Sequence, residues 1–145
     1  MKRVRLIALV ALVPVLLAGC SVSPGDKVRV TMKEWSINVT PAQATSGRVR
    51  FEIDSDGERT HNFALILAKD IADVPKTPQG AIDLVASRPI DEIDAFEPGH
   101  YIATTPNLLA GDYLMVCTLV TDGVPHFAQG MVAKFHVNER AKKST

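Results

Sequence analysis

Aromatic residues and cysteines are scarce in this 145-residue chain, and neither sign of charge predominates. Aromatic residues make up 6% of the sequence, there are 2 cysteines, and 16 basic residues balance 16 acidic ones. The first nineteen residues hold three of the basic residues (Lys2, Arg3 and Arg5) and no acidic one, so 13 basic and 16 acidic residues follow them. A nucleic-acid-binding domain normally carries a basic patch or stripe. We therefore expect no nucleic-acid partner.

The motifs of several common enzyme classes are also missing. The sequence contains no Walker loop, no G-x-G-x-x-G turn and no G-x-S-x-G nucleophile elbow. Cys117 with His61 or His126 would suit a cysteine nucleophile and its base, but no further hydrolase motif accompanies them. We therefore expect that the chain catalyses no reaction on its own.

The one long apolar run lies at the start of the chain. It extends from Leu6 to Ala18, is broken only by Pro14 and follows the three basic residues. Its length is short for a permanent membrane-spanning helix, and the pattern is typical of a signal peptide, which we predict over residues 1–19. An ordinary signal peptide with a chance cysteine after it is one interpretation.

The sequence Leu17-Ala18-Gly19-Cys20 favours another interpretation, because it resembles the bacterial lipobox. In that motif the cysteine is lipidated and becomes the mature N-terminus. We therefore expect an acylated Cys20, followed by a linker through residue 26, and a domain tethered to a bacterial membrane in the cell envelope, facing the periplasm or the exterior.

From residue 27 onward, short stretches alternate apolar and polar residues. Val28, Val30 and Met32 form one such series, and turn signals such as Asp54-Ser55-Asp56-Gly57 separate the stretches. Alternation with a period of two is typical of strands with one buried face. About seven such strands over residues 27–137 predict an all-β fold, an antiparallel β-sandwich, with a polar tail over residues 138–145.

Residues 69–99 interrupt this alternation. Thr77 and Pro78 are typical of the cap and first position of a helix, and Pro89 of the position just past its end. We therefore predict a short helical insertion, packed over one edge of the sandwich. A solvated acidic loop is expected after it, with a docking patch for a basic partner as the alternative; its residues are Asp91, Glu92, Asp94 and Glu97.

The loop from Cys117 to Met131 carries three soft donors. It reads C-T-L-V-T-D-G-V-P-H-F-A-Q-G-M and places a thiol, an imidazole (His126) and a thioether between two strand-like runs. Cu(I) favours thiolate and thioether, and two histidines, one cysteine and a weak axial methionine form the blue-copper ligand set. His61, at the head of another strand, is the best candidate for the second imidazole. Zinc is a competing metal, although thioether suits it poorly.

These residues carry a resemblance to a known family. The runs G-D-Y-L-M-V-C and P-H-F-A-Q-G-M, with His61-Asn62-Phe63 upstream, resemble the ligand motifs of the cupredoxins, the small type 1 copper proteins. The resemblance covers roughly residues 27–137 and implies a Greek-key sandwich. It also implies one copper ion held by His61, Cys117, His126 and an axial Met131, with the Asn62 backbone N–H near the sulfur.

One departure from the family concerns the loop length. Eight residues separate Cys117 from His126, more than in many cupredoxins, and the extra Thr121-Asp122-Gly123 indicates an added turn. We expect this to affect solvent access, docking and the axial position of Met131. His100 and His136 are expected to lie outside the metal site, with His136 facing water, and Trp35 is expected in the core.

Three functions follow from this interpretation. The first is a lipid-anchored electron carrier that works with a redox partner protein. The second is a copper-binding lipoprotein that buffers the metal or delivers it to a copper-accepting protein. The third is a metal-free interaction domain on the same sandwich.

Overall fold

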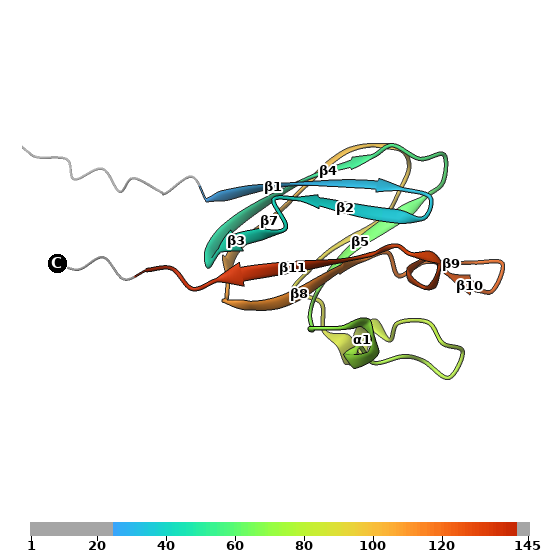
Figure 1. Ribbon diagram of the computed structural model, residues 1–145. Coiled ribbons are helices and arrows are strands. Elements are labelled where there is room, and N and C mark those ends of the chain that lie inside the picture. Colours follow the sequence, from blue (N-terminus) through green and yellow to red (C-terminus); the bar gives the residue numbers. More distant parts are fainter. Residues whose placement is uncertain (1–24, 142–145) are drawn as a thin grey trace, which may run out of the picture.

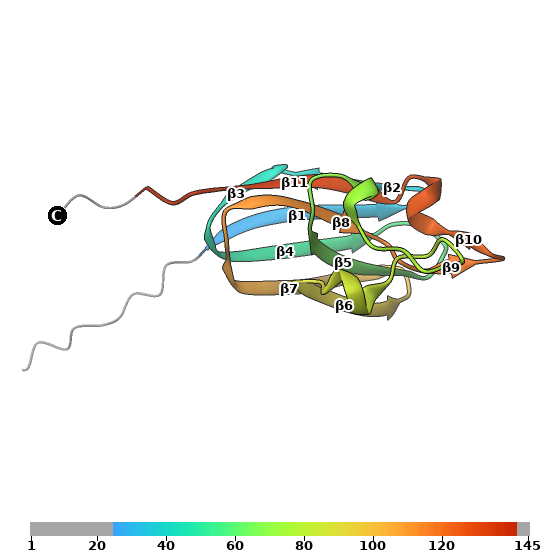
Figure 2. The same ribbon diagram turned by 90° about the horizontal axis from the view of Figure 1, so that it is seen from below.

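Two β-sheets face each other in the computed structural model, which describes residues 25–141. Figure 1 shows the two layers, and Figure 2 shows the same layers turned by 90°. The predicted signal peptide, Cys20 and most of the linker lie outside the described residues. None of the helices found between residues 25 and 141 has the length and apolar character needed to cross a bilayer.

The first sheet has four strands in the order β2-β1-β4-β7. Their bounds are β1 Asp26–Lys33, β2 Ser36–Thr40, β4 Gly47–Ser55 and β7 Gly99–Leu108. The second sheet has five strands in the order β3-β11-β8-β5-β6. Their bounds are β3 Gln43–Thr45, β5 His61–Leu67, β6 Asp91–Phe96, β8 Gly111–Val116 and β11 Val132–Asn138.

The predicted all-β sandwich is confirmed, although not every strand pair is antiparallel. β1 pairs with β4, and β3 with β11, in parallel, whereas the other pairs in the two sheets are antiparallel. The chain crosses from one sheet to the other between Thr40 and Gln43 and returns at β4, so β4 runs in the same direction as β1. Apolar alternation reports which face of a strand is buried and carries no information on strand direction.

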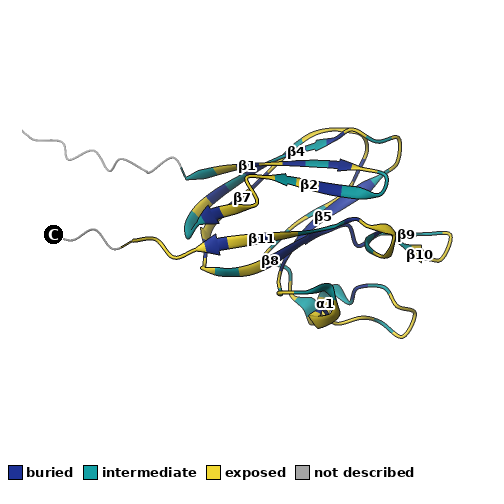
Figure 3. Ribbon diagram, viewed as in Figure 1, coloured by how far each residue is buried: buried dark blue, intermediate teal, exposed yellow. Residues whose placement is uncertain are grey.

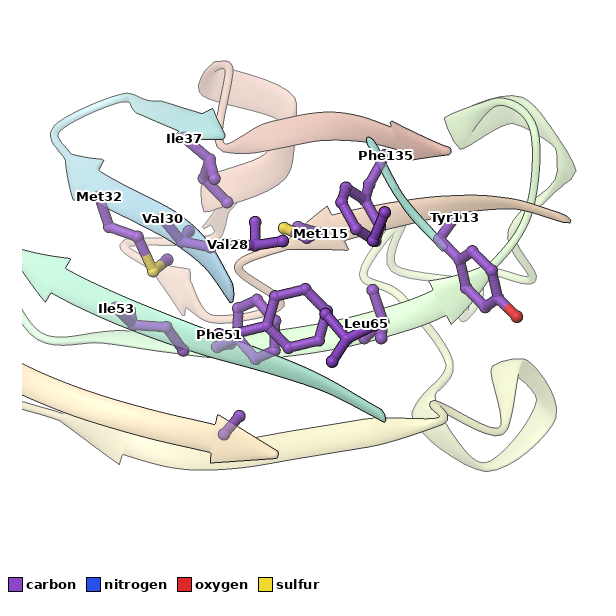
Figure 4. Packing of buried hydrophobic residues seen from close by; sticks show 14 of the residues in the cluster. Val28, Val30, Met32, Ile37, Phe51, Ile53, Leu65, Tyr113, Met115 and Phe135 are labelled. Atoms are coloured by element: carbon purple, nitrogen blue, oxygen red, sulfur yellow. The ribbon is translucent and has the colours of Figure 1, made fainter. Parts of the chain in front are cut away.

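The core fills the space between the sheets with side chains from both layers (Figure 4). Val28, Val30 and Met32 of β1 are fully buried, as their alternation indicated. The ring of Phe51 on β4 packs against Phe63 at 5.8 Å and against Phe135 at 5.6 Å between centroids. Burying side chains of this size stabilises the fold by about 1.5–3 kcal/mol each. In Figure 3, buried residues recur along the strands of both sheets.

The insertion between β5 and β6 covers the outer face of the five-stranded sheet rather than its edge. Val74 and Ile82 form a second buried cluster with Ala64, Ile66 and Leu114, which point away from the main core. This explains why six consecutive residues of β5 are buried, His61 through Ile66. The strand that begins at His61 is therefore packed on both faces.

The predicted helix is shorter and begins later than expected. α1 spans Leu84–Ser87, with Asp83 as its N-cap accepting a hydrogen bond from the backbone N–H of Ala86 at 3.0 Å. Thr77 belongs to a turn in which its carbonyl accepts from the N–H of Gly80, at 2.9 Å. Gly80 has φ +82°, a left-handed conformation that ends any helix starting there. Pro89 follows the end of α1, as predicted. A short 3₁₀ turn, η1, covers Ile71–Asp73.

The expected acidic loop is instead the edge strand β6. Asp91–Phe96 pairs with β5 in an antiparallel register, and the Asp91 carboxylate accepts a hydrogen bond from the Thr105 hydroxyl at 2.8 Å. Glu92 and Asp94 are exposed. Charged side chains on an edge strand discourage pairing with another sheet, and this accounts for the acidic composition that resembled a loop.

The two ends of the sandwich differ in what they carry. The start of β1 and the end of β11 lie together at one end, where Asp26 accepts from the Thr45 N–H and the Asn138 carbonyl from the Ser46 N–H. The hairpin of β9 (Val120–Thr121) and β10 (Val124–Pro125), followed by the 3₁₀ turn η2 (His126–Gln129), lies at the opposite end (Figure 2).

Candidate metal centre

The thiol and the two imidazoles named from the sequence come together at the end of the sandwich that carries η2. Cys117 follows β8, His61 begins β5 and His126 begins η2. Their ligand atoms all lie within 4.8 Å of one another, and all three side chains are buried. The Cys117 Sγ atom is 3.4 Å from Nδ1 of His126 and 4.0 Å from Nδ1 of His61. Both rings thus turn the same nitrogen toward the sulfur.

Backbone hydrogen bonds close the loop that carries two of these donors. The Cys117 N–H donates to the Met131 carbonyl at 3.1 Å, and the Met131 N–H donates to the His126 carbonyl at 3.2 Å. The His126 N–H donates to the Leu119 carbonyl at 2.8 Å. The added residues form the β9–β10 hairpin, whose turn residues Asp122 and Gly123 have positive φ angles of 52° and 77°, the conformation that such tight hairpin turns require.

Asn62 fixes the sulfur from the neighbouring strand. Its backbone N–H points at the Cys117 Sγ atom at 3.4 Å. Its side chain makes two buried hydrogen bonds to Thr118, donating to the hydroxyl and accepting from the backbone N–H, both at 2.7 Å. The strand head that carries His61 and the loop that starts at Cys117 are therefore held together by a buried amide.

The outer nitrogens of the two rings have different neighbours. His126 Nε2 lies 2.9 Å from the Thr121 hydroxyl of the β9–β10 hairpin. His61 Nε2 is buried and makes no hydrogen bond within the described residues; a Glu34 carboxylate oxygen lies 3.6 Å from it. His126 is 1% exposed, because the hairpin covers its outer edge.

Three residues near the centre were not identified from the sequence as its neighbours. Glu34 and Trp35, in the turn between β1 and β2, reach the site from the other sheet. Trp35, expected in the core, is only partly buried, and its ring packs edge-on against His126 at 5.0 Å. The Arg59 guanidinium lies over the Trp35 ring, 5.4 Å from its centroid. Nothing in the local pattern of these residues indicates a place beside a metal site.

Met131 and the two remaining histidines lie in different surroundings. Met131 is fully buried and precedes β11, tied to Cys117 through its carbonyl. His100 and His136 are exposed and lie beside carboxylates, with Nδ1 2.7 Å from an oxygen of Asp54 and of Asp112 respectively. Neither belongs to the cluster of His61, Cys117 and His126.

Burial sets the protonation of the three donors. It lowers the pKa of His61, against the opposing effect of the Glu34 carboxylate, and it lowers the pKa of His126, an effect that the nearby His61 strengthens. Burial raises the pKa of the Cys117 thiol, although the Asn62 N–H acts in the opposite direction. At neutral pH both imidazoles are therefore neutral and can bind a metal, whereas the thiol must release its proton when it binds one.

These shifts predict that the metal-free protein is most stable between about pH 6.5 and pH 9. The two histidines have pKa values below their ordinary 6.5, so their contribution is complete above pH 6.5 and is lost as the pH falls. The thiol has a pKa above its ordinary 9.0, so its contribution is complete below pH 9.0 and is lost as the pH rises. Urea unfolding at pH values from 5 to 10 measures the loss of stability on the acidic side (the acidic limb) and on the alkaline side (the alkaline limb). Cys117→Ser should flatten the alkaline limb alone, and an unchanged alkaline limb would contradict the assignment.

Comparison with known proteins identifies the fold. No protein-family model and no curated protein sequence matches the chain. Among solved structures, reduced auracyanin from Roseiflexus castenholzii aligns at 16% identity and a TM-score of 0.55, covering 77% of this chain and 95% of its own. Reduced rusticyanin aligns at 18% identity and a TM-score of 0.52, covering 80% and 82%.

A third solved structure is auracyanin A, described as a "blue" copper protein from Chloroflexus aurantiacus. It aligns at 18% identity and a TM-score of 0.50, covering 76% of this chain and 99% of its own. These proteins are cupredoxins, and this chain has the cupredoxin fold.

Proposed function

We propose that this protein binds one copper ion in a type 1 site and carries single electrons outside the cytoplasmic membrane, to which Cys20 anchors it through lipid. The observation that carries the proposal is the buried cluster of His61, Cys117 and His126, whose ligand atoms lie within 4.8 Å of one another. One thiolate and two imidazoles are the donors that this site requires. The blue copper protein auracyanin A has the same fold.

The donor set suits copper better than zinc. His61, Cys117 and His126 would hold the ion, and Met131 would offer it a thioether. A copper ion in such a site supplies a one-electron couple. Zinc would need a fourth donor that completes a tetrahedron, and within residues 25–141 no carboxylate or further imidazole joins the cluster. The thioether of Met131 favours copper.

The way the donors are held supports electron transfer rather than copper delivery. Two of the three donors are fixed by hydrogen bonds: Cys117 by Asn62 and Met131, and His126 by Leu119 and Thr121. Donors that are already assembled and buried rearrange little when the charge of the ion changes, which is what a carrier needs. A delivery site has to release its metal, and the β9–β10 hairpin that covers His126 would obstruct that release.

The proposed location comes from the start of the sequence. The basic residues, apolar run and lipobox-like Leu17-Ala18-Gly19-Cys20 support export and acylation. We infer that a redox partner protein meets the domain in the cell envelope, and that the protein catalyses nothing alone.

Copper titration of the full-length protein purified in detergent tests the proposal. We expect one equivalent of Cu(II) to give an intense thiolate-to-copper absorption in the visible range, with a reversible one-electron couple by voltammetry. Tight Cu(I) binding with ready transfer to a chelator and no such absorption would identify a delivery protein instead. Retention of zinc alone, or of no metal, would overturn the copper assignment.

A further inference from the structure

We propose that Glu34 is a positioning residue for the metal centre: its carboxylate accepts the N–H of His61 Nε2 when Nδ1 binds copper, and its charge favours the oxidised ion. This inference rests on the proposed function and deepens it. It assigns to a turn residue of the opposite sheet a direct influence on the reduction potential.

The first observation is the unpaired ring nitrogen of His61. Buried polar atoms are nearly always hydrogen-bonded, and His61 Nε2 is buried with no hydrogen-bond partner within residues 25–141. A histidine that binds metal through one nitrogen almost always donates its other N–H to a carboxylate, carbonyl or water. His126 has the Thr121 hydroxyl at 2.9 Å in this position. For His61 the neighbouring acceptor is Glu34 Oε1, at 3.6 Å.

The second observation is that the Glu34 carboxylate is held in place. Its Oε1 atom accepts from the backbone N–H groups of Glu58 and Arg59, at 2.8 Å and 2.7 Å. The side chain is 24% exposed, so solvent screens it only in part. A carboxylate fixed by two backbone donors is oriented before any metal binds, and it needs to move only a few tenths of an ångström to reach hydrogen-bonding distance from His61.

The third observation is that the turn leaves room for this carboxylate. Gly57 lies directly beside it, and a Cβ atom at this position would come within 2.5 Å of both Oε1 and Oε2 of Glu34. No real Cβ atom tolerates that distance, so any larger residue at position 57 would displace the carboxylate. The absence of a side chain at Gly57 is therefore part of the arrangement that brings Glu34 to His61.

The consequence for copper follows from charge. A carboxylate that accepts the Nε2 proton makes the imidazole a stronger electron donor, and a negative charge close to the ion stabilises Cu(II) more than Cu(I). Arg59, whose guanidinium lies over Trp35, offsets this charge only in part because it lies toward the surface. Glu34 should therefore lower the reduction potential of the site.

The test compares Glu34→Gln with Glu58→Gln in the full-length protein purified in detergent. Both changes remove one negative charge from adjacent turns, but the Glu58 side chain is exposed, whereas the Glu34 carboxylate lies 3.6 Å from His61. We expect Glu34→Gln to weaken Cu(II) affinity relative to Cu(I) about 10- to 100-fold, the usual effect of losing an outer partner. Each tenfold change raises the potential by about 59 mV. Glu58→Gln should shift the potential by less than half as much.

Gly57→Ala is the second variant, and it keeps every charge. Its methyl group should push the Glu34 carboxylate away from His61, so we expect the potential to rise as it does in Glu34→Gln. Nitrogen NMR of the Cu(I) protein gives an independent reading, because the hydrogen-bonded Nε2–H signal of His61 should move in both variants and stay unchanged in Glu58→Gln.

The outcomes separate this inference from the proposed function. A wild-type protein with the visible absorption and redox couple, but equal potentials in all variants, would overturn the role of Glu34 and leave the electron carrier standing. If the wild type shows no blue copper site, the same comparison is made with Co(II) affinity. A 10-fold or larger loss of Co(II) affinity in Glu34→Gln, without such a loss in Glu58→Gln, supports the positioning role, and equal affinities overturn it. Should Glu34→Gln fail to fold, the reduction potential of Gly57→Ala is compared with that of the wild type. A rise supports the role of Glu34, and an unchanged potential overturns it.

Discussion

Replacing Cys117 with serine is expected to abolish both the intense visible absorption of the copper-loaded protein and its reversible one-electron couple. The absorption arises from charge transfer between a thiolate and copper, and a serine hydroxyl supplies no soft, deprotonated donor at neutral pH. The two imidazoles remain, so we expect the variant to bind Cu(II) only weakly and to show a pale colour. Optical titration and voltammetry of the variant provide the measurement.

Cys20→Ser is the matched control, because it removes the other thiol of the chain. This variant should keep the full absorption and the redox couple. It should also fail to partition into detergent or membrane fractions, since the proposed acylation site has been removed. Retention of the blue colour in Cys117→Ser, or its loss in Cys20→Ser, would contradict the assignment of Cys117 as the thiolate ligand.

Asn62→Ala should lower the free energy of unfolding of the metal-free protein by about 3 kcal/mol. The amide makes two buried hydrogen bonds to Thr118, both at 2.7 Å. A buried hydrogen bond contributes about 1 kcal/mol, and leaving the Thr118 N–H unsatisfied costs a further 1–3 kcal/mol. Urea unfolding measures the loss. The copper spectrum should also shift, because the Asn62 N–H near the sulfur depends on this clamp.

Asn138→Ala serves as its control. The Asn138 amide is exposed and makes longer hydrogen bonds, at 3.4 Å to Gln43 and 3.3 Å to the Ala44 carbonyl. Its removal should cost less than about 1 kcal/mol. Equal losses in the two variants would show that the buried amide has no special role in joining the two segments.

The strand positions were predictable from the sequence because each strand has a local signature. Val28, Val30 and Met32 alternate with polar residues, and this pattern depends only on one face being buried. The parallel pairing of β1 with β4 has no such signature, since it results from the chain passing through the other sheet. The start of the helix at Leu84 was missed for a different reason: the left-handed Gly80 forms a turn where Thr77 and Pro78 resemble a helix start.

The candidate site was partly predictable for a similar reason. His61, Cys117 and His126 are chemically distinctive, and their order along the chain carries a resemblance to a known family. Glu34, Trp35 and Thr121 are not distinctive, since their importance comes from which segments the fold brings together. Glu34 lies 27 positions before His61 in the sequence, and only the packing of the β1–β2 turn against the head of β5 makes them neighbours.

The start of β1 and the proposed copper ligands lie at opposite ends of the sandwich. β1 runs from Asp26, at the end of the sandwich where β11 also ends, to Lys33, beside the Glu34 that lies near His61 (Figure 1). At roughly 3.3 Å per residue this strand is about 25 Å long. If Cys20 carries the proposed acyl group, the anchored end of the domain and the proposed copper site are about 25 Å apart along β1. A partner protein would then meet this site at the end of the domain opposite the anchor.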